Sequence, residues 1–186
     1  AFAVAGLMVA NGGWQNIELS ASDARMRSYF GTYTINHSSD NRARWLSHGT
    51  TMHGMQLLDA PTVPISYYAP TSGVGLAMGS VPRLYGKDAN VGVVGLGTGT
   101  LACYRQPGQY WNFFEIDPLM IEIAETRGIF SFVSKCAPNV PVTLGDARLT
   151  LADVKPGTYD ILAIDAFSSD AIPLHLMTKE AFEVYR

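Results

Sequence analysis

The alternation of apolar runs with helical segments from residue 90 onward constrains the fold of this 186-residue chain more than any other feature. Four runs are apolar enough to be buried strands, and helical sequences separate them: "VGVVGL", "YWNFFEID", "VPVTLGDA" and "YDILAIDA". Near-continuous apolar strands in such an alternation are typical of a parallel sheet covered on both faces. We therefore predict an α/β, Rossmann-like (doubly wound) parallel sheet. Its first and fourth strands should lie side by side at the switch point, where ligands bind.

Capping residues predict where several helices begin and end. In "DPLMIEIAETRG", Asp117 is suited to the N-cap and Pro118 to the first helical position, and Gly128 closes the segment. Thr178 is the expected cap of the last helix. A further helix is expected over residues 72–85, despite its glycines.

The first sixty residues have a different pattern. The segments "MRSYFGTYTIN", "RARWLSHG" and "TMHGMQLLD" are rich in strand-forming residues, and two prolines in "APTVP" follow them. We predict an antiparallel sheet of two to four strands, giving a β-hairpin region over residues 1–60 and a Rossmann-like domain over residues 61–186. The three tryptophans are expected in core or hairpin packing: Trp14, Trp45 and Trp111.

Both ends of the sequence leave questions open. The opening "AFAVAGLMVA" is too short to span a bilayer, and it fits a buried strand, an ordered arm or the remnant of a trimmed segment. The sequence stops within the helix after the fourth strand, whereas a doubly wound sheet normally continues. We therefore expect a sheet truncated after strand four, in a piece of a longer chain or with its edge covered by another chain.

Composition argues against several functions. The chain has 13 basic and 16 acidic residues and no basic cluster, so nucleic-acid binding is not expected. Cys103 and Cys136 lack metal-ligand spacing and are expected to be free thiols in a reducing compartment. No pair of histidines has the spacing of a helical metal site, so no metal is expected; the four are His37, His48, His53 and His175.

A glycine turn follows the first strand of the parallel sheet. Gly95, Gly97 and Gly99 give the pattern GxGxG, which lacks the lysine of a P-loop and differs from the GxGxxG of dinucleotide-binding turns. This spacing suits a backbone that packs against a nucleoside and an amino-acid tail. The alternative is a turn needed only for tight packing of a strand and a helix.

Acidic residues at the ends of the next strands narrow the choice of ligand. Glu115 can accept both ribose hydroxyls, as NAD and S-adenosyl ligands require, and Asp146 can accept the exocyclic amine of adenine or simply cap the next helix. Together with GxGxG they favour S-adenosylmethionine over NAD. After the fourth strand, Asp165 and Asp170 could hold a cation or deprotonate an amine, or form a turn with the serines between them.

Several motifs resemble the spermidine synthase, or polyamine aminopropyltransferase, family. They are "VGVVGLGTGTLACY", "FFEIDP", "LGDARLTLA" and "YDILAIDAFSSDAIPLHLMTKEAFEVY", and the resemblance extends from about Arg25. "SHGTTMHGMQ" and "YYAPTSGVG" are similar to a bacterial branch often fused to membrane helices. The resemblance implies an N-terminal β-hairpin domain followed by a Rossmann-like domain of the class I methyltransferase type. It also implies decarboxylated S-adenosylmethionine as aminopropyl donor and a diamine such as putrescine as acceptor.

The resemblance also implies roles for individual residues. Glu115 would bind the ribose, Asp146 with Ala147 the adenine, and Gln56 the tail of the donor. Asp165, Asp170 and Tyr68 would be catalytic, one aspartate acting as base, because an ammonium is no nucleophile until it loses a proton. His53 is expected either to line the acceptor pocket or to be a hairpin histidine bonded to backbone.

Partners and localisation follow from the same resemblance, and two alternatives stay open. The family commonly pairs through its N-terminal sheets, so the resemblance implies a homodimer. It also implies a location in the cytoplasm, either as a free protein or as the soluble domain of a membrane-attached protein. A methyltransferase or an enzyme that cleaves S-adenosylmethionine would fit Thr98 better, since family members usually carry an aspartate there. A non-catalytic nucleoside-binding module of a membrane protein is the second alternative.

Overall fold

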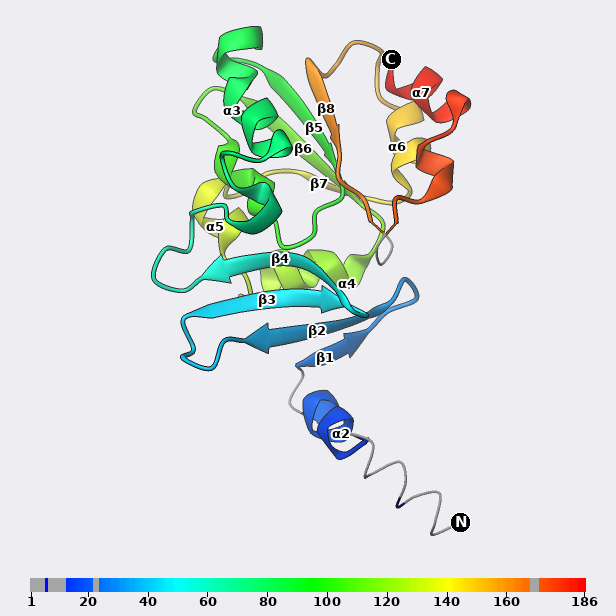
Figure 1. Cartoon of the computed structure of the whole chain (residues 1–186). Helices are drawn as coiled ribbons and strands as arrows, with labels where there is room; N and C mark the ends of the chain where they lie inside the picture. The colour runs from blue at the N-terminus through cyan, green and yellow to red at the C-terminus, as the bar shows by residue number, and fades with distance from the viewer. Residues whose placement is uncertain (1–5, 7–12, 22–23, 168–170) are drawn as a thin grey trace.

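The computed structural model describes residues 6, 13–21, 24–167 and 171–186, in which two four-stranded sheets form the framework (Figure 1). The first sheet contains β1 (Arg25–Arg27), β2 (Thr32–His37), β3 (Ala43–His48) and β4 (Thr51–Leu57). The second contains β5 (Asn90–Val94), β6 (Tyr110–Glu115), β7 (Val142–Leu144) and β8 (Ile161–Ile164).

The N-terminal sheet is an antiparallel meander in the order β1-β2-β3-β4, as the sequence predicts. Alternate side chains of β2, such as Tyr33 and Ile35, are buried. They pack with Leu46 of β3 against Met120 and Phe132, which follow β6. The N-terminal sheet is therefore held against the parallel sheet by a shared apolar cluster.

The C-terminal sheet is parallel, with the order β7-β6-β5-β8. Val94, at the end of β5, has Phe114 of β6 on one side and Ile164 of β8 on the other. The predicted Rossmann-like sheet and its adjacent first and fourth strands are confirmed. The carboxyl ends of β5, β6 and β8 consequently meet at one edge, where the chain reverses its direction of winding.

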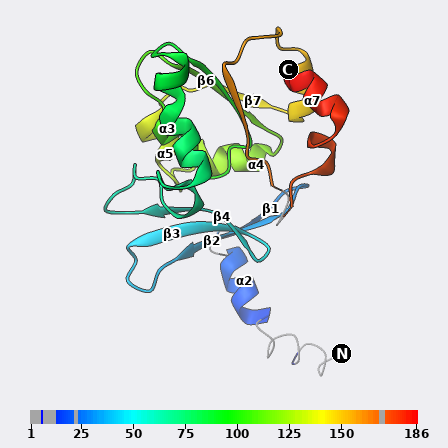
Figure 2. The same cartoon turned by 45° about the horizontal axis from the view of Figure 1, so that its top comes forward.

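Helices cover both faces of the parallel sheet (Figures 1 and 2). On one face, α3 (Gly73–Tyr85) and α5 (Phe132–Cys136) contribute to the core of β5 and β6. On the other face, α6 (Ala147–Ala152) and α7 (Lys179–Tyr185) enclose Val94 and Phe114. The short helix α4 (Pro118–Ile121) lies between the two sheets, and α2 (Trp14–Ala21) projects from the N-terminal sheet.

Side-chain caps begin the helices where the sequence predicts them. Asp117 accepts the backbone N–H of Leu119, and Thr178 accepts that of Ala181. Ser72 caps α3 in the same way. After α4 the chain continues as a π-helical turn, η4 (Glu122–Thr126), and leaves it before Gly128, which has a positive φ of 64°.

Two local expectations are wrong. The helix expected after the glycine turn is only a 3₁₀ turn, η3 (Thr100–Tyr104), because "QPG" ends it before β6 begins. Trp14 is 65% exposed and lies on α2, a helix that the strand-like pattern of this region did not predict. Trp111, in contrast, is buried in the core as expected.

The two cysteines form a disulfide, so the prediction of free thiols is wrong. Cys103 lies in η3 and Cys136 ends α5, and their Cα atoms are 4.7 Å apart. Packing of α5 on η3 brings them together across 33 residues of sequence. Such a pairing depends on tertiary contacts, and spacing alone could not reveal it.

Two expectations concern residues outside the part of the chain that the structure describes: the nature of the apolar opening and the position of Asp170. Among the described residues, no helix combines the length and the apolar character needed to cross a bilayer.

Candidate active site

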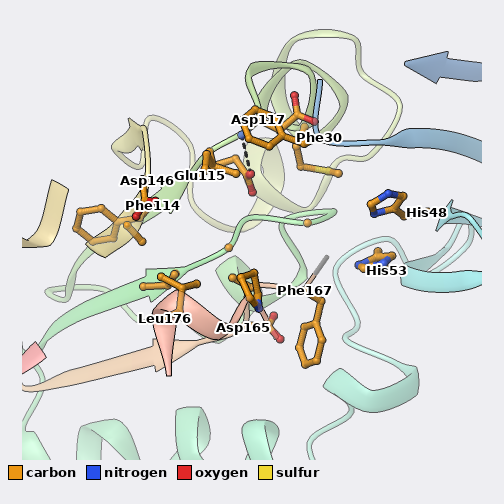
Figure 3. Close-up of a pocket in the computed structure, with 18 of the residues that line it drawn as sticks. Phe30, His48, His53, Phe114, Glu115, Asp117, Asp146, Asp165, Phe167 and Leu176 are labelled. Atoms are coloured by element: carbon orange, nitrogen blue, oxygen red, sulfur yellow. Dashed lines mark hydrogen bonds between the residues drawn. The ribbon is translucent and has the colours of Figure 1, made fainter. Parts of the chain in front are cut away.

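A cavity of about 290 Å³ lies between the carboxyl ends of the parallel strands and the N-terminal sheet (Figure 3). Its walls come from the glycine turn, the segments after β6, β7 and β8, and the ends of β3 and β4. In Figure 3, Asp146, Phe114 and Leu176 lie at one end and His48 and His53 at the other, with Glu115 and Asp165 between them. The cavity is thus long enough to have two chemically different ends.

The glycine turn forms the floor of the cavity. Gly95 has a φ of 95°, and a Cβ there would lie 2.5 Å from the carbonyl oxygen of Asp165. Glycine at this position therefore allows the ends of β5 and β8 to approach each other. Gly97 also lines the cavity, whereas Gly99 packs against Val133 of α5 and lies outside the lining.

Glu115, at the end of β6, presents its carboxylate to the cavity from a buried position. Its Oε2 accepts the backbone N–H of Leu96 at 2.9 Å, and its Oε1 accepts that of Asp117 at 2.9 Å. Burial raises the pKa of Glu115, and these hydrogen bonds partly oppose the rise. Each oxygen retains a lone pair that can accept a hydroxyl, so the geometry suits a ribose.

Asp146 follows β7 and reaches the cavity from the start of α6. Its Oδ1 accepts the backbone N–H of Arg148 at 2.9 Å, so the carboxylate does cap α6. Its Oδ2 lies 3.2 Å from Nε2 of His175. Capping α6 and facing the cavity are therefore compatible, so the cap leaves the second role considered from the sequence, accepting the exocyclic amine of adenine, open to this side chain.

Asp165, just after β8, is paired with Tyr68. The Tyr68 hydroxyl donates to Oδ2 of Asp165 at 2.6 Å, although the two residues lie 97 positions apart. Burial raises the pKa of Asp165 to about 6, despite the opposing effect of this hydrogen bond. Burial and the neighbouring carboxylate raise the pKa of Tyr68 well above its usual value, so the phenol stays a donor. A carboxylate with a pKa near 6 is suited to general-base chemistry near neutral pH.

Aromatic side chains line the end of the cavity beyond Asp165. The rings of His48 and His53 are 5.6 Å apart between centroids, and those of Tyr67 and Tyr68 are 4.4 Å apart. Phe167 lies beside Asp165 in Figure 3. His53 thus does line the cavity, one of the two positions considered for it.

The charges of the lining are one-sided. Four carboxylic acids line the cavity, and none of its described lining residues is a lysine or an arginine; the four are Glu115, Asp117, Asp146 and Asp165. Such a surface favours ligands that carry positive charge and disfavours ligands that carry a carboxylate.

Besides Gly99, two residues considered from the sequence lie away from this cavity. Gln56 is fully buried, with its Oε1 accepting from Arg44 and its Nε2 donating to Pro61 O and Ser131 Oγ. Thr98 is 1% exposed and lies beneath Gly54 of β4. The predicted set that the structure brings together is Tyr68, Gly95, Gly97, Glu115, Asp146, Ala147 and Asp165.

Other lining residues were not assigned to a site from the sequence. Tyr33 and His48 come from the N-terminal sheet, whose side chains cannot be assigned to a cavity without knowing how the sheets pack. His175 could have been noticed, because "PLH" directly follows the loop after β8.

The fold and site define a Rossmann-like protein with an acidic cavity at its switch point.

Similarity to known proteins is found both in sequence and in structure. The chain is 34% identical over 99 residues to a polyamine aminopropyltransferase of Vibrio vulnificus, covering 50% of this chain and 32% of the relative. It is 30% identical over 107 residues to a probable polyamine aminopropyl transferase of Bifidobacterium longum, covering 58% of this chain and 23% of the relative. This sequence therefore spans a third or less of these curated relatives. No protein-family model matches it.

Among solved structures, similar folds occur in a probable spermidine synthase from Corynebacterium glutamicum, with a TM-score of 0.70 and 18% identity. A spermidine synthase from Thermotoga maritima gives a TM-score of 0.62 with 19% identity. Each match covers 87% of this chain, with 58% and 51% of the respective solved chains. These similarities confirm the Rossmann-like fold and the resemblance to the spermidine synthase, or polyamine aminopropyltransferase, family.

Proposed function

We propose that this protein is an aminopropyltransferase that takes the aminopropyl group of decarboxylated S-adenosylmethionine and transfers it to an amine, with a diamine such as putrescine as the expected acceptor. The observation that carries the proposal is the acidic lining without lysine or arginine among its described residues, with a partly buried carboxylate of raised pKa, Asp165, at its centre. Both proposed substrates are cations, and the donor lacks the carboxylate that this lining would repel. Sequence similarity to curated polyamine aminopropyltransferases supports the same reaction.

The two ends of the cavity suggest how a donor would lie. Glu115 offers two oriented oxygens to the ribose hydroxyls, and Asp146 offers an acceptor to the exocyclic amine of adenine. Ala147 and Leu176 would pack against the adenine ring, since they belong to the apolar cluster at the Asp146 end of the cavity. The sulfonium and the aminopropyl chain would then point toward Asp165 and the aromatic end.

The proposed reaction is a direct displacement. The acceptor nitrogen attacks the aminopropyl carbon bonded to sulfur, the new C–N bond forms, and the C–S bond breaks. The bonding electron pair moves to sulfur, which becomes the neutral thioether of methylthioadenosine. Asp165 takes the proton lost by the amine, while Tyr68 holds the carboxylate in place through its hydroxyl. Positioning supplies much of the remaining rate enhancement, because a sulfonium is already a good leaving group.

A methyltransferase or an S-adenosylmethionine-cleaving enzyme is the second candidate. The absence of an acid at Thr98 favours it, because nothing at that position would select the decarboxylated donor. Thr98 is buried away from the cavity, however, so selection would depend on the lining carboxylates. A non-catalytic nucleoside-binding module would need none of the pairing between Asp165 and Tyr68.

The test is product analysis by mass spectrometry. The protein is incubated with putrescine and with either decarboxylated or intact S-adenosylmethionine, and each product is identified. We expect spermidine and methylthioadenosine from the decarboxylated donor, and at least about a hundredfold loss of rate in Asp165→Asn, the effect typical of removing a general base. Asp153→Asn, which alters an exposed carboxyl outside the cavity, should keep the wild-type rate. Methylated or cleaved products from the intact donor would reject aminopropyl transfer, and no product would favour the binding module.

A further inference from the structure

His175 is a lining residue whose role the proposed reaction does not yet use. It lies in the 3₁₀ turn η5 (Leu174–Leu176), after β8, and its Nε2 is 3.2 Å from Oδ2 of Asp146. To bond a carboxylate, Nε2 must carry a hydrogen, which it does in one neutral tautomer and in the cation. In either form the imidazole can donate to this carboxylate, which faces the end of the cavity where the adenine base is proposed to lie (the base end).

The turn that carries His175 is anchored on one side, through Leu176. Leu176 is 4% exposed and packs with Phe114 and Ala147 at the base end. Its carbonyl accepts the Tyr185 hydroxyl of α7 at 3.1 Å. Leu174, on the other side of His175, is 86% exposed and lies outside the cavity lining. The backbone next to His175 is thus held in place through Leu176.

Each oxygen of Asp146 consequently has a nitrogen beside it, from a different element. Oδ1 accepts the backbone N–H of Arg148, and Oδ2 lies 3.2 Å from Nε2 of His175. A hydrogen bond from Nε2 to Oδ2 would restrict rotation of the carboxylate and give its remaining lone pairs set directions. A carboxylate only accepts hydrogen bonds, so it binds the amino group of a purine and repels a carbonyl oxygen at the same position.

We propose that His175 is a positioning residue that makes the base end selective for 6-amino purines over 6-oxo purines, by fixing the Asp146 carboxylate against rotation. This inference rests on the proposed donor site. Without the His175 contact, Asp146 keeps its cap to α6, but its second oxygen is free to turn toward solvent. Adenine would then lose its oriented acceptor, whereas hypoxanthine, which never had one, would lose little.

The test compares binding of methylthioadenosine and methylthioinosine by calorimetry. Wild-type protein should prefer methylthioadenosine. In His175→Leu, methylthioadenosine binding should weaken about fivefold to tenfold, the effect of one hydrogen bond, while methylthioinosine binding stays the same. His175→Gln, which can still donate from its amide, should recover most of the preference. Leu174→Gln, one position earlier on the same turn, should behave as wild type.

The ratio of the two affinities separates positioning from general damage, because a distorted cavity would weaken both nucleosides. An unchanged ratio in His175→Leu would overturn the role of His175 and leave the donor site intact. Equal losses for both nucleosides in the Leu and Gln variants would also overturn it. If wild-type protein binds neither nucleoside, the proposed donor site fails, and this inference fails with it.

Discussion

Asp165 is held at the end of β8 in surroundings that make its charge costly for folding. Burial raises its pKa from 3.8 to about 6, so the folded protein binds the proton more tightly than the unfolded chain does. Between about pH 4 and pH 6 the folded state therefore carries more protons, and its free energy of unfolding falls as the pH rises through this window. Above pH 6, this pKa shift of about two units corresponds to a loss of about 3 kcal/mol in the free energy of unfolding.

The variant Asp165→Asn should remove this cost, because the amide oxygen still accepts the Tyr68 hydroxyl and carries no charge. At pH 8 we expect its free energy of unfolding to exceed that of wild type by about 2 to 3 kcal/mol, measured by urea denaturation. The gain should shrink below pH 6 and disappear near pH 3, where the wild-type carboxyl is protonated in both states. An Asp165→Asn variant less stable than wild type at pH 8 would contradict the raised pKa.

The hydroxyl of Tyr68 should set the pH at which turnover begins. Its hydrogen bond lowers the pKa of Asp165, so Tyr68→Phe should let that pKa rise above about 6. Because the base must be deprotonated, turnover rises with pH through its pKa. The rising limb should move to higher pH by about 0.7 unit, which corresponds to a hydrogen bond of about 1 kcal/mol. Measuring kcat from pH 5 to 9 checks this.

Tyr29→Phe is the matched control for that pH profile, because Tyr29 is 96% exposed and lies outside the cavity. The rising part of its kcat–pH profile should coincide with that of wild type. A Tyr68→Phe limb that stays in place, or moves to lower pH, would show that Tyr68 does not stabilise the charged form of Asp165.

Among the elements, α4 joins the two sheets through one carboxylate. Asp117 is 1% exposed; its Oδ1 caps α4 and its Oδ2 accepts the hydroxyls of Ser28 and Tyr33 from the N-terminal sheet. Asp117→Ala removes the cap and leaves two hydroxyls without this acceptor. We expect a loss of about 2 to 4 kcal/mol in the free energy of unfolding.

Urea denaturation of Asp117→Ala beside Tyr33→Phe tests that account of α4. Tyr33→Phe removes one hydroxyl together with its bond, so its loss should be smaller, about 1 kcal/mol. Equal stability of Asp117→Ala and wild type would show that this carboxylate does not hold the sheets together.

The sequence predicted these elements unevenly. The cap at Asp117 and the strand order around β5 were predictable, because capping residues and apolar strand runs are local signals. The contact between Asp117 and Tyr33 was not, since it spans 84 positions and depends on how the sheets pack. The disulfide between Cys103 and Cys136 escaped prediction for the same reason. Trp14 was expected in core or hairpin packing because the strand-like pattern of the first sixty residues was taken to include it, whereas its segment is helical.

For the whole molecule, the predictable part of the site is the part supplied by the parallel sheet. Residues at the carboxyl ends of parallel strands share one edge, so Glu115, Asp146 and Asp165 could be grouped before their positions were known. The opposite wall comes from the N-terminal sheet, and its residues Tyr33 and His48 could be placed only once the packing of the two sheets was known. Pairing of copies and attachment to a membrane stay predictions.

The central claim is that this acidic cavity binds a decarboxylated S-adenosyl donor, and calorimetric titration tests it most directly. We expect decarboxylated S-adenosylmethionine to bind at least about tenfold more tightly than the intact compound, because the extra carboxylate meets four lining acids without a described lysine or arginine to pair with. Asp146→Ala should weaken both. Equal or tighter binding of intact S-adenosylmethionine would contradict aminopropyl transfer, and binding of neither compound would contradict the donor site itself.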